Sequence, residues 1–184
     1  HTLFFNRGKP VFEAQAGWTD QRNRIAQVTG FESRRRSEYF MRTRYNVESA
    51  WTIRLNSSAG TRFSESENFP NKNYLLQFWE IRPELEWTPS RSFRWQASFR
   101  WQNDQEQSRE NGDVADTREL RATLTYNQSV KTTLSGTLSL VQIDYQGRPN
   151  SPVGFAILNG LQRGRNLLWN LQLDQQLGQN LRLS

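Results

Sequence analysis

The chain has 184 residues, a hydrophobic content of only 35% and a net charge of +6 at pH 7. Soluble globular domains are usually about 45–50% apolar, so this composition disfavours a large buried core, while seven tryptophans and 12% aromatics argue against disorder. No cysteine is present, which excludes disulfides, thiolate metal sites and cysteine nucleophiles.

Alternation of apolar and polar residues predicts β-strands along the whole chain, which we treat as a single segment, residues 1–184, without an internal boundary. Eight full strands are expected, at residues 12–29, 37–47, 51–63, 74–87, 92–102, 120–126, 134–140 and 167–173, with partial strands at 1–5 and 181–184. Longer polar connections are expected at residues 30–36, 65–72, 103–116 and 147–163, with a short helical or strand piece at 155–158. Pro83 predicts a β-bulge in its strand, because proline cannot donate to a ladder.

Residues 92–102 show the alternation without a break. Phe93, Trp95 and Trp101 share one face of this strand, and Arg94 and Arg100 share the other. A soluble sandwich or barrel buries such an apolar face, whereas an outer-membrane barrel turns it toward lipid and lines its interior with polar residues. The direction of the apolar face therefore decides the class of protein.

Tight turns near residues 8, 49, 90 and 129 recur about every 40 residues, one more follows near 178, and longer polar loops lie between them. This is the pattern of an antiparallel up-and-down barrel with short turns at one end and long loops at the other. The apolar positions stop about seven to eleven residues after each short turn, comparable to a strand that crosses a bilayer. The sequence thus predicts an all-β, antiparallel up-and-down transmembrane β-barrel, present as a segment of a larger barrel.

Aromatic residues beside the short turns, among them Trp51, Trp87 and Tyr126, are typical of the interfacial girdle of a membrane protein. The residues expected to face lipid are Trp51, Ile53, Leu55, Trp79, Trp87, Phe93, Trp95, Phe99, Trp101, Leu124, Tyr126, Leu138, Trp169 and Leu171. Those expected to face the lumen are Arg42, Arg44, Arg54, Glu80, Arg82, Glu84, Glu86, Arg94, Arg100 and Arg121.

Several short motifs extend this interpretation: residues 6–10 (NRGKP), 30–34 (GFESR), 44–47 (RYNV), 144–145 (DY), 158–166 (LNGLQRGRN) and 177–184 (LGQNLRLS). With these motifs the chain resembles the carboxy-terminal barrel region of large, mostly uncharacterised outer-membrane proteins of Bacteroidota. Members of that family continue past the last motif through a further hairpin. The resemblance therefore implies a cell-surface, porin-like or structural barrel, of which this chain is one part.

Enzymatic activity is not expected. The single histidine, His1, lies at one end of the sequence, so a histidine-dependent hydrolase is disfavoured. The carboxylates Glu80, Glu84 and Glu86 share a face and could serve glycoside cleavage. A charge ladder is the better interpretation, and its expected partners are Arg82, Arg94, Arg100 and Arg121. No metal or cofactor site is expected, because the acidic residues of the 104–116 loop lack the spacing of a calcium loop.

The basic charge also raises the question of nucleic acid, with a pI near 10.2. Stacked bases and contacted phosphates require aromatic and cationic side chains on one face, whereas here they alternate between two. We therefore expect a membrane anchor, pore or scaffold in the bacterial outer membrane. Its partners would be lipid and the rest of its barrel or other outer-membrane subunits, without nucleic acid. The alternative is a soluble all-β module that binds glycans or nucleic acid.

Overall fold

A computed structural model of the chain describes residues 1–8, 11–27, 30–48, 50–108, 112–129, 132–148, 150–176 and 182–183. The strands are β1 (Thr2–Phe5), β2 (Phe12–Gln27), β3 (Gly30–Asn46), β4 (Trp51–Ser66), β5 (Tyr74–Ser90), β6 (Phe93–Glu106), β7 (Val114–Ser129), β8 (Thr132–Gln146), β9 (Gly164–Gln176) and β10 (Arg182–Leu183). A 3₁₀ turn, η1 (Pro70–Lys72), precedes β5, and one α-helix, α1 (Pro152–Leu158), lies between β8 and β9.

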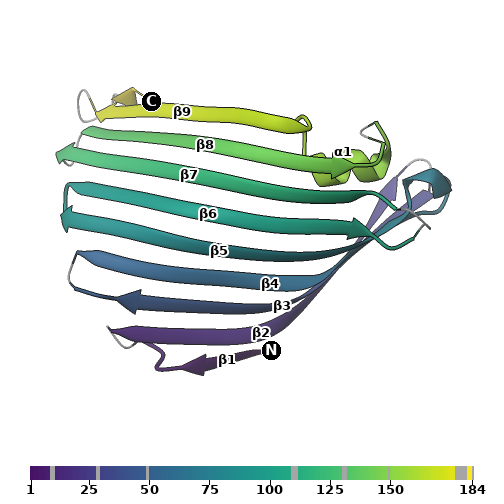
Figure 1. Cartoon of the computed structure of the whole chain (residues 1–184), viewed down its shortest axis with the longest axis horizontal. Coiled ribbons are helices and arrows are strands. Elements are labelled where there is room, and N and C mark those ends of the chain that lie inside the picture. Colours follow the sequence, from purple (N-terminus) through teal and green to yellow (C-terminus); the bar gives the residue numbers. More distant parts are fainter. Residues whose placement is uncertain are drawn as a thin grey trace.

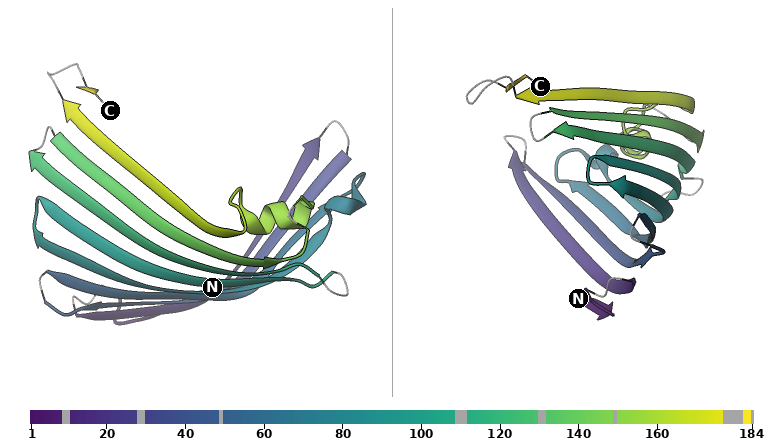
Figure 2. Two further views of the ribbon diagram at one scale, coloured as in Figure 1. Left: turned by 45° about the horizontal axis from the view of Figure 1, so that its top comes forward. Right: turned by 90° about the vertical axis from the view of Figure 1, so that its left-hand side faces the viewer.

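All ten strands form one antiparallel sheet in sequence order, which confirms the prediction of an all-β up-and-down fold. The strands β2 to β9 are 13 to 17 residues long, whereas β1 and β10 have four and two. Short turns lie at one end of the sheet, and η1 and α1 lie at the other (Figure 1). The sheet is strongly curved and open, with β1 and β10 at its two edges (Figure 2). The predicted turn near residue 178 falls outside the described residues.

Several strands extend beyond their predicted limits at the end away from the short turns. The charged loop predicted at residues 30–36 is wrong, because β3 already begins at Gly30. Its charges are satisfied in strand geometry instead: Arg35 Nε lies 3.0 Å from Asp20 Oδ1 of β2, and Arg36 pairs with Glu38 two positions along β3. The connection predicted at 103–116 is likewise shorter, because β6 runs to Glu106 and β7 starts at Val114.

The bulge predicted at Pro83 is also wrong. Pro83 is opposite Leu55 of β4, and the β5–β6 register is the same at Ile81 and at Glu84, on both sides of the proline. The proline only interrupts the β5–β6 ladder locally, where its missing N–H would have donated. A register shift occurs further along, between Trp87 and Ser90.

The helix α1 lies against the concave side of the sheet (Figure 2). It begins at Pro152 after the cap residue Ser151, whose Oγ accepts from Gly154 N at 2.9 Å. It ends at Leu158, and the cap residue Asn159 has a left-handed φ of 49°. The helix confirms that a regular piece lies within residues 147–163 and shows that it is helical.

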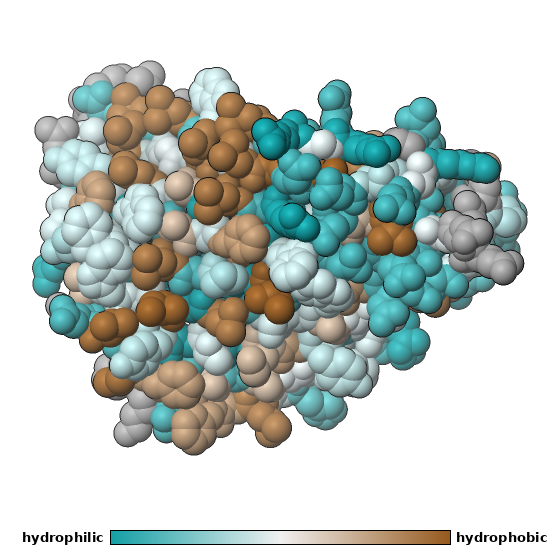
Figure 3. All heavy atoms as spheres, viewed as in Figure 1, coloured by the Kyte–Doolittle hydropathy of each residue, from teal (hydrophilic) through white to brown (hydrophobic). Residues whose placement is uncertain are grey.

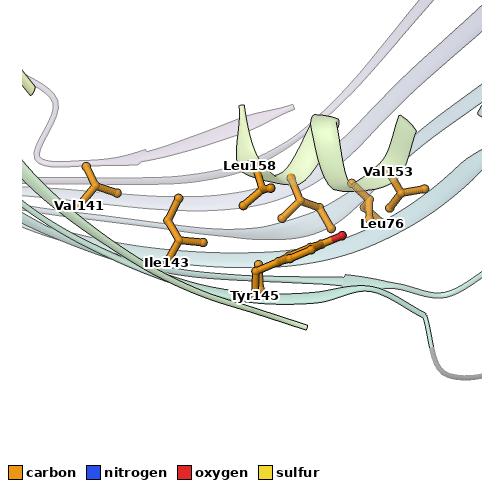
Figure 4. Packing of buried hydrophobic residues seen from close by; sticks show 8 residues of the cluster. Leu76, Val141, Ile143, Tyr145, Val153 and Leu158 are labelled. Carbon is orange, nitrogen blue, oxygen red and sulfur yellow. The ribbon is translucent and has the colours of Figure 1, made fainter. Parts of the chain in front are cut away.

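A small apolar core joins α1 to the sheet. Leu76 of β5, Val141, Ile143 and Tyr145 of β8, and Val153 of α1 are at most 3% exposed (Figure 4). This cluster is the main buried core among the described residues, so most of the long sheet has no second layer on either face.

Candidate functional site: two opposed faces of the sheet

The register divides every strand into a convex and a concave set of side chains, because directly opposed residues of antiparallel strands project to the same side. Val141, Ile143 and Tyr145 contact α1 and therefore define the concave side of β8. The residue opposite each of these on a neighbouring strand also faces the concave side. Repeating this step from strand to strand assigns a face to the residues of β2 to β9.

The convex face carries the large apolar side chains. It includes all the residues predicted to face lipid, from Trp51 on β4 to Leu171 on β9. It also carries all seven tryptophans of the chain: Trp18, Trp51, Trp79, Trp87, Trp95, Trp101 and Trp169. Figure 3 shows this face, with apolar residues gathered over the half of the sheet near the short turns and hydrophilic residues over the other half.

The apolar residues of the convex face form a band of nearly constant height. The band covers residues 12–18 on β2, 51–59 on β4, 93–101 on β6 and 167–173 on β9. These spans are roughly seven to nine residues, or about 24–31 Å along a strand at ~3.4 Å per residue. The apolar belt of outer-membrane barrels is ~25 Å tall.

The band crosses the strands obliquely. When the pairs are followed from strand to strand, Leu167 of β9 lies level with Ala14 of β2, whereas the band on β2 extends to Trp18. At the other border, Phe12 of β2 lies level with Trp169 of β9, whereas the band on β9 extends to Leu173. A belt perpendicular to the axis of a barrel must cross tilted strands in this way.

Aromatic rings mark both borders of the band. Near the short turns, the Trp87 ring stacks on Trp51 with centroids 5.6 Å apart and meets Phe93 edge-on at 5.7 Å. At the opposite border, the indole N–H groups donate to polar groups outside the band: Trp18 Nε1 to Ser37 Oγ at 3.0 Å, and Trp101 Nε1 to Asp116 Oδ1 at 2.9 Å. An apolar ring with its N–H directed to a polar layer is the arrangement that indoles adopt at a membrane interface.

The concave face is polar and rich in ion pairs. It carries all the residues predicted to face a lumen: Arg42, Arg44, Arg54, Glu80, Arg82, Glu84, Glu86, Arg94, Arg100 and Arg121. Arg44 Nη2 lies 2.9 Å from Glu13, and Arg54 Nη1 lies 2.9 Å from Glu86. The concave face is thus a wall of fixed, largely compensated charges.

The three carboxylates considered for acid–base chemistry are held apart by different partners. Glu80 pairs with Arg82 at 2.7 Å, and Glu86 pairs with Arg54. Glu84 accepts from Asn56 Nδ2 at 3.3 Å and from Gln96 Nε2 at 3.4 Å. Each carboxylate therefore has a structural partner.

The arginines that pair with these carboxylates are only partly those expected from the sequence. Arg100 and Arg121 both pair with Glu119 of β7, at 2.8 and 2.7 Å, and not with the glutamates of β5. Arg94 reaches Glu86 only at 3.9 Å. Glu119 was not predicted from the sequence as a site residue, although it lies two positions from Arg121 and therefore on the same face of β7.

A large cavity occupies the concave face beside α1. Its volume is about 860 Å³, and its lining comes from β3 to β8 and from α1. The charged side chains that line it are Arg36, Arg42, Arg54, Arg62, Arg82, Arg100, Glu38, Glu80 and Glu84. The apolar side of the cavity consists of Ile143 and of residues 156–158 and 161.

The apolar core beneath α1 was not predicted from the sequence. The apolar positions of β8 switch from even to odd numbers after Leu140, so that Val141, Ile143 and Tyr145 face the concave side. Two adjacent apolar residues, Leu140 and Val141, mark this switch in the sequence. A similar change on β5 places Leu76 on the concave face.

No helix in the described part of the chain has the length and apolar character needed to cross a membrane. Within the same residues, no group of three or more His, Cys, Asp or Glu side chains is arranged to hold a metal ion. Comparison of the chain with protein-family models, with curated proteins and with solved structures found no match.

Proposed function

We propose that the chain forms part of the wall of a β-barrel in a bacterial outer membrane, where it acts as an anchor, pore or scaffold of a surface complex without catalysis. The convex face would contact lipid, and the concave face would line the lumen. The resemblance to the carboxy-terminal barrels of Bacteroidota surface proteins gives the same expectation.

One observation carries the proposal: the direction of the apolar face. The band on the convex side has the height of a membrane belt, is bordered by aromatic rings and includes every tryptophan of the chain. In a soluble barrel or sandwich the apolar side chains would face inward. Here the concave side carries Arg–Glu pairs along its length, with apolar packing only beneath α1.

The edges of the sheet support a larger assembly. On its outer side β2 pairs with β1 at residues 14–17 and with His1 at Trp18, and β9 pairs with β10 only at Gln175 and Gln176 among the described residues. Each backbone N–H or C=O group left without a hydrogen bond in lipid destabilises the structure by roughly several kcal/mol. The proposal therefore includes further strands at these edges, from the same barrel or from another outer-membrane subunit.

The test is quenching of tryptophan fluorescence by brominated lipid. The full protein is reconstituted in vesicles whose acyl chains are brominated at different depths, and acrylamide serves as the aqueous quencher. We expect strong quenching by lipid and weak quenching by acrylamide, because all the tryptophans lie on the convex face.

Two results would overturn the proposal: a protein that stays monodisperse without detergent, or tryptophans quenched by acrylamide and not by brominated lipid. Either result would favour a soluble all-β binding module. Heat-modifiable mobility in gels provides an independent check of barrel formation. Planar-bilayer conductance separates an open pore from an anchor or scaffold.

A further inference from the structure

The cavity beside α1 combines a cationic floor with an apolar wall. Six arginines and three glutamates line it, and three of the arginines, Arg54, Arg62 and Arg100, pair with carboxylates outside the lining. Across from the arginines, α1 contributes Ala156, Ile157 and Leu158. The volume of about 860 Å³ lies in the range of small-molecule sites, roughly 300–1,000 Å³.

The arginine side chains of the cavity are more exposed than their acidic partners, which lie deeper. In the pair of Arg100 and Glu119, the exposed fractions of the side chains are 27% and 5%. In the pair of Arg62 and Asp104 they are 29% and 1%. Each guanidinium has five donors, and one carboxylate uses only part of them. The surface of the cavity is therefore rich in unused cationic donors.

Three arginines show this spare capacity directly. Arg42 has no acidic partner in the described part of the chain, and its guanidinium lies over the Phe40 ring, 4.9 Å from the centroid. The Nε atoms of Arg62 and Arg100 are buried and donate to no protein acceptor within the described residues. These two Nε atoms are enclosed by the protein, so a ligand in the cavity would meet the terminal Nη groups of the same two guanidinium groups.

The arginines are also held in place. The Arg62 guanidinium lies 4.4 Å from the centroid of Phe78, and Arg36 lies over the same ring at 5.3 Å. Stacking on an aromatic face fixes a guanidinium without consuming its N–H donors. A ligand would therefore meet a preorganised set of donors, which reduces the entropic cost of binding.

We propose that this cavity binds a small organic anion with two or more acidic groups and an apolar part. The acidic groups would contact Arg42, Arg62 and Arg100. The apolar part would pack on Ile157 and Leu158 of α1. This inference rests on the proposed function in one respect, namely that the concave face lines the lumen of a barrel. The anion would then be a cargo or a regulator of that barrel.

The test uses the full protein in a nonionic detergent and 1,3,6,8-pyrenetetrasulfonate, a fluorescent aromatic tetra-anion, as the probe. Fluorescence anisotropy is followed at two salt concentrations, with inorganic pyrophosphate as a competitor that lacks an apolar part. We expect saturable binding that weakens with salt, and competition by pyrophosphate only at higher concentrations.

Arg42→Gln should weaken binding by about tenfold, the effect of ~1.4 kcal/mol for one charge-assisted hydrogen bond. Arg24→Gln is the matched control, because Arg24 also lies over a phenylalanine, Phe31 at 4.2 Å, but on the convex face. It removes the same charge and should leave binding within about twofold, since exposed charges further away than ~10 Å are screened. Ala156→Trp, which fills the cavity from α1 and leaves all arginines in place, should abolish binding.

The proposal is overturned if the probe does not saturate, or if Arg42→Gln and Arg24→Gln weaken it equally, since the effect would then be general charge. Retention of full affinity in Ala156→Trp would place the binding elsewhere and would also overturn it. These outcomes are independent of membrane insertion: tryptophans not quenched by lipid with binding intact would refute only the barrel proposal. The reverse combination would refute only the anion site.

Discussion

The Tyr145 hydroxyl donates a 2.6 Å hydrogen bond to Oδ2 of Asp113, which joins the end of β8 to the segment that precedes β7. The same carboxylate accepts from Ser151 Oγ at 3.2 Å and from Arg148 N at 3.4 Å. Asp113 thus holds the residues that lead into α1, while the Tyr145 ring belongs to the core beneath the helix. The helix is fixed to the sheet by both polar and apolar contacts.

Replacement of Tyr145 by Phe should destabilise the packing of α1. The ring is retained, so only the hydrogen bond is lost and Asp113 keeps two donors; the expected cost is about 1 kcal/mol. The change is measured by urea unfolding of the detergent-solubilised protein. Tyr126→Phe on the convex face, where the ring is 42% exposed, serves as the control and should have little effect. Equal effects of the two substitutions would contradict the assigned contact.

The pH dependence of stability tests the same bond from another direction. Burial, followed by the hydrogen bond to Asp113, raises the pKa of Tyr145 above its ordinary value near 10. The folded state therefore favours the protonated phenol, and its stabilising contribution is complete below pH ~10 and is lost as the pH rises toward the folded pKa. Between pH 9 and 11 we expect the wild type to lose stability faster than Tyr145→Phe. Parallel curves would contradict the expectation.

A charge in the middle of the convex band should prevent stable insertion. Leu55 lies at the centre of the band on β4, and Arg at the bilayer midplane costs about 2–4 kcal/mol. Leu55→Arg should therefore reduce the heat-modifiable, lipid-inserted fraction.

Thr61→Arg is the matched control for Leu55→Arg. It places the same charge on the same face of β4 but outside the band, where the expected cost is at most ~1 kcal/mol. Equal insertion of both variants would show that the band does not lie in lipid.

The two faces could be predicted from the sequence because alternation fixes them locally. Phe93 and Arg94 must project to opposite sides of β6 wherever the strand lies. The length of the strands could not be predicted beyond the apolar band, since Arg35 and Arg36 give the same composition as a loop and are ordered by pairing with Asp20 and Glu38.

The contact between α1 and β8 could not be predicted from the sequence for a different reason. The apolar residues of β8 change face after Leu140. Val141 and Ile143 are buried on their new face because α1 packs against them. That contact joins segments on either side of the loop, so no local period reports it.

A final prediction concerns Asp104, which lies on the concave face of β6 just beyond the band and is 1% exposed. Burial raises the pKa of its carboxyl, and the opposing effects of Arg62 at 3.6 Å and of the Gln102 amide at 2.6 Å are smaller. A raised pKa means that folding favours the protonated acid, so any stabilisation is present at low pH and is lost as the pH rises through the folded value. At pH 7, well above the ordinary pKa of a carboxyl group, the raised pKa makes Asp104 a net cost to folding. Asp104→Asn keeps an acceptor for the Gln102 amide and should therefore unfold at a higher urea concentration than the wild type. The difference should vanish near pH 3, where both side chains are neutral. A variant less stable than the wild type at pH 7 would show that the ion pair with Arg62 outweighs the cost of burial.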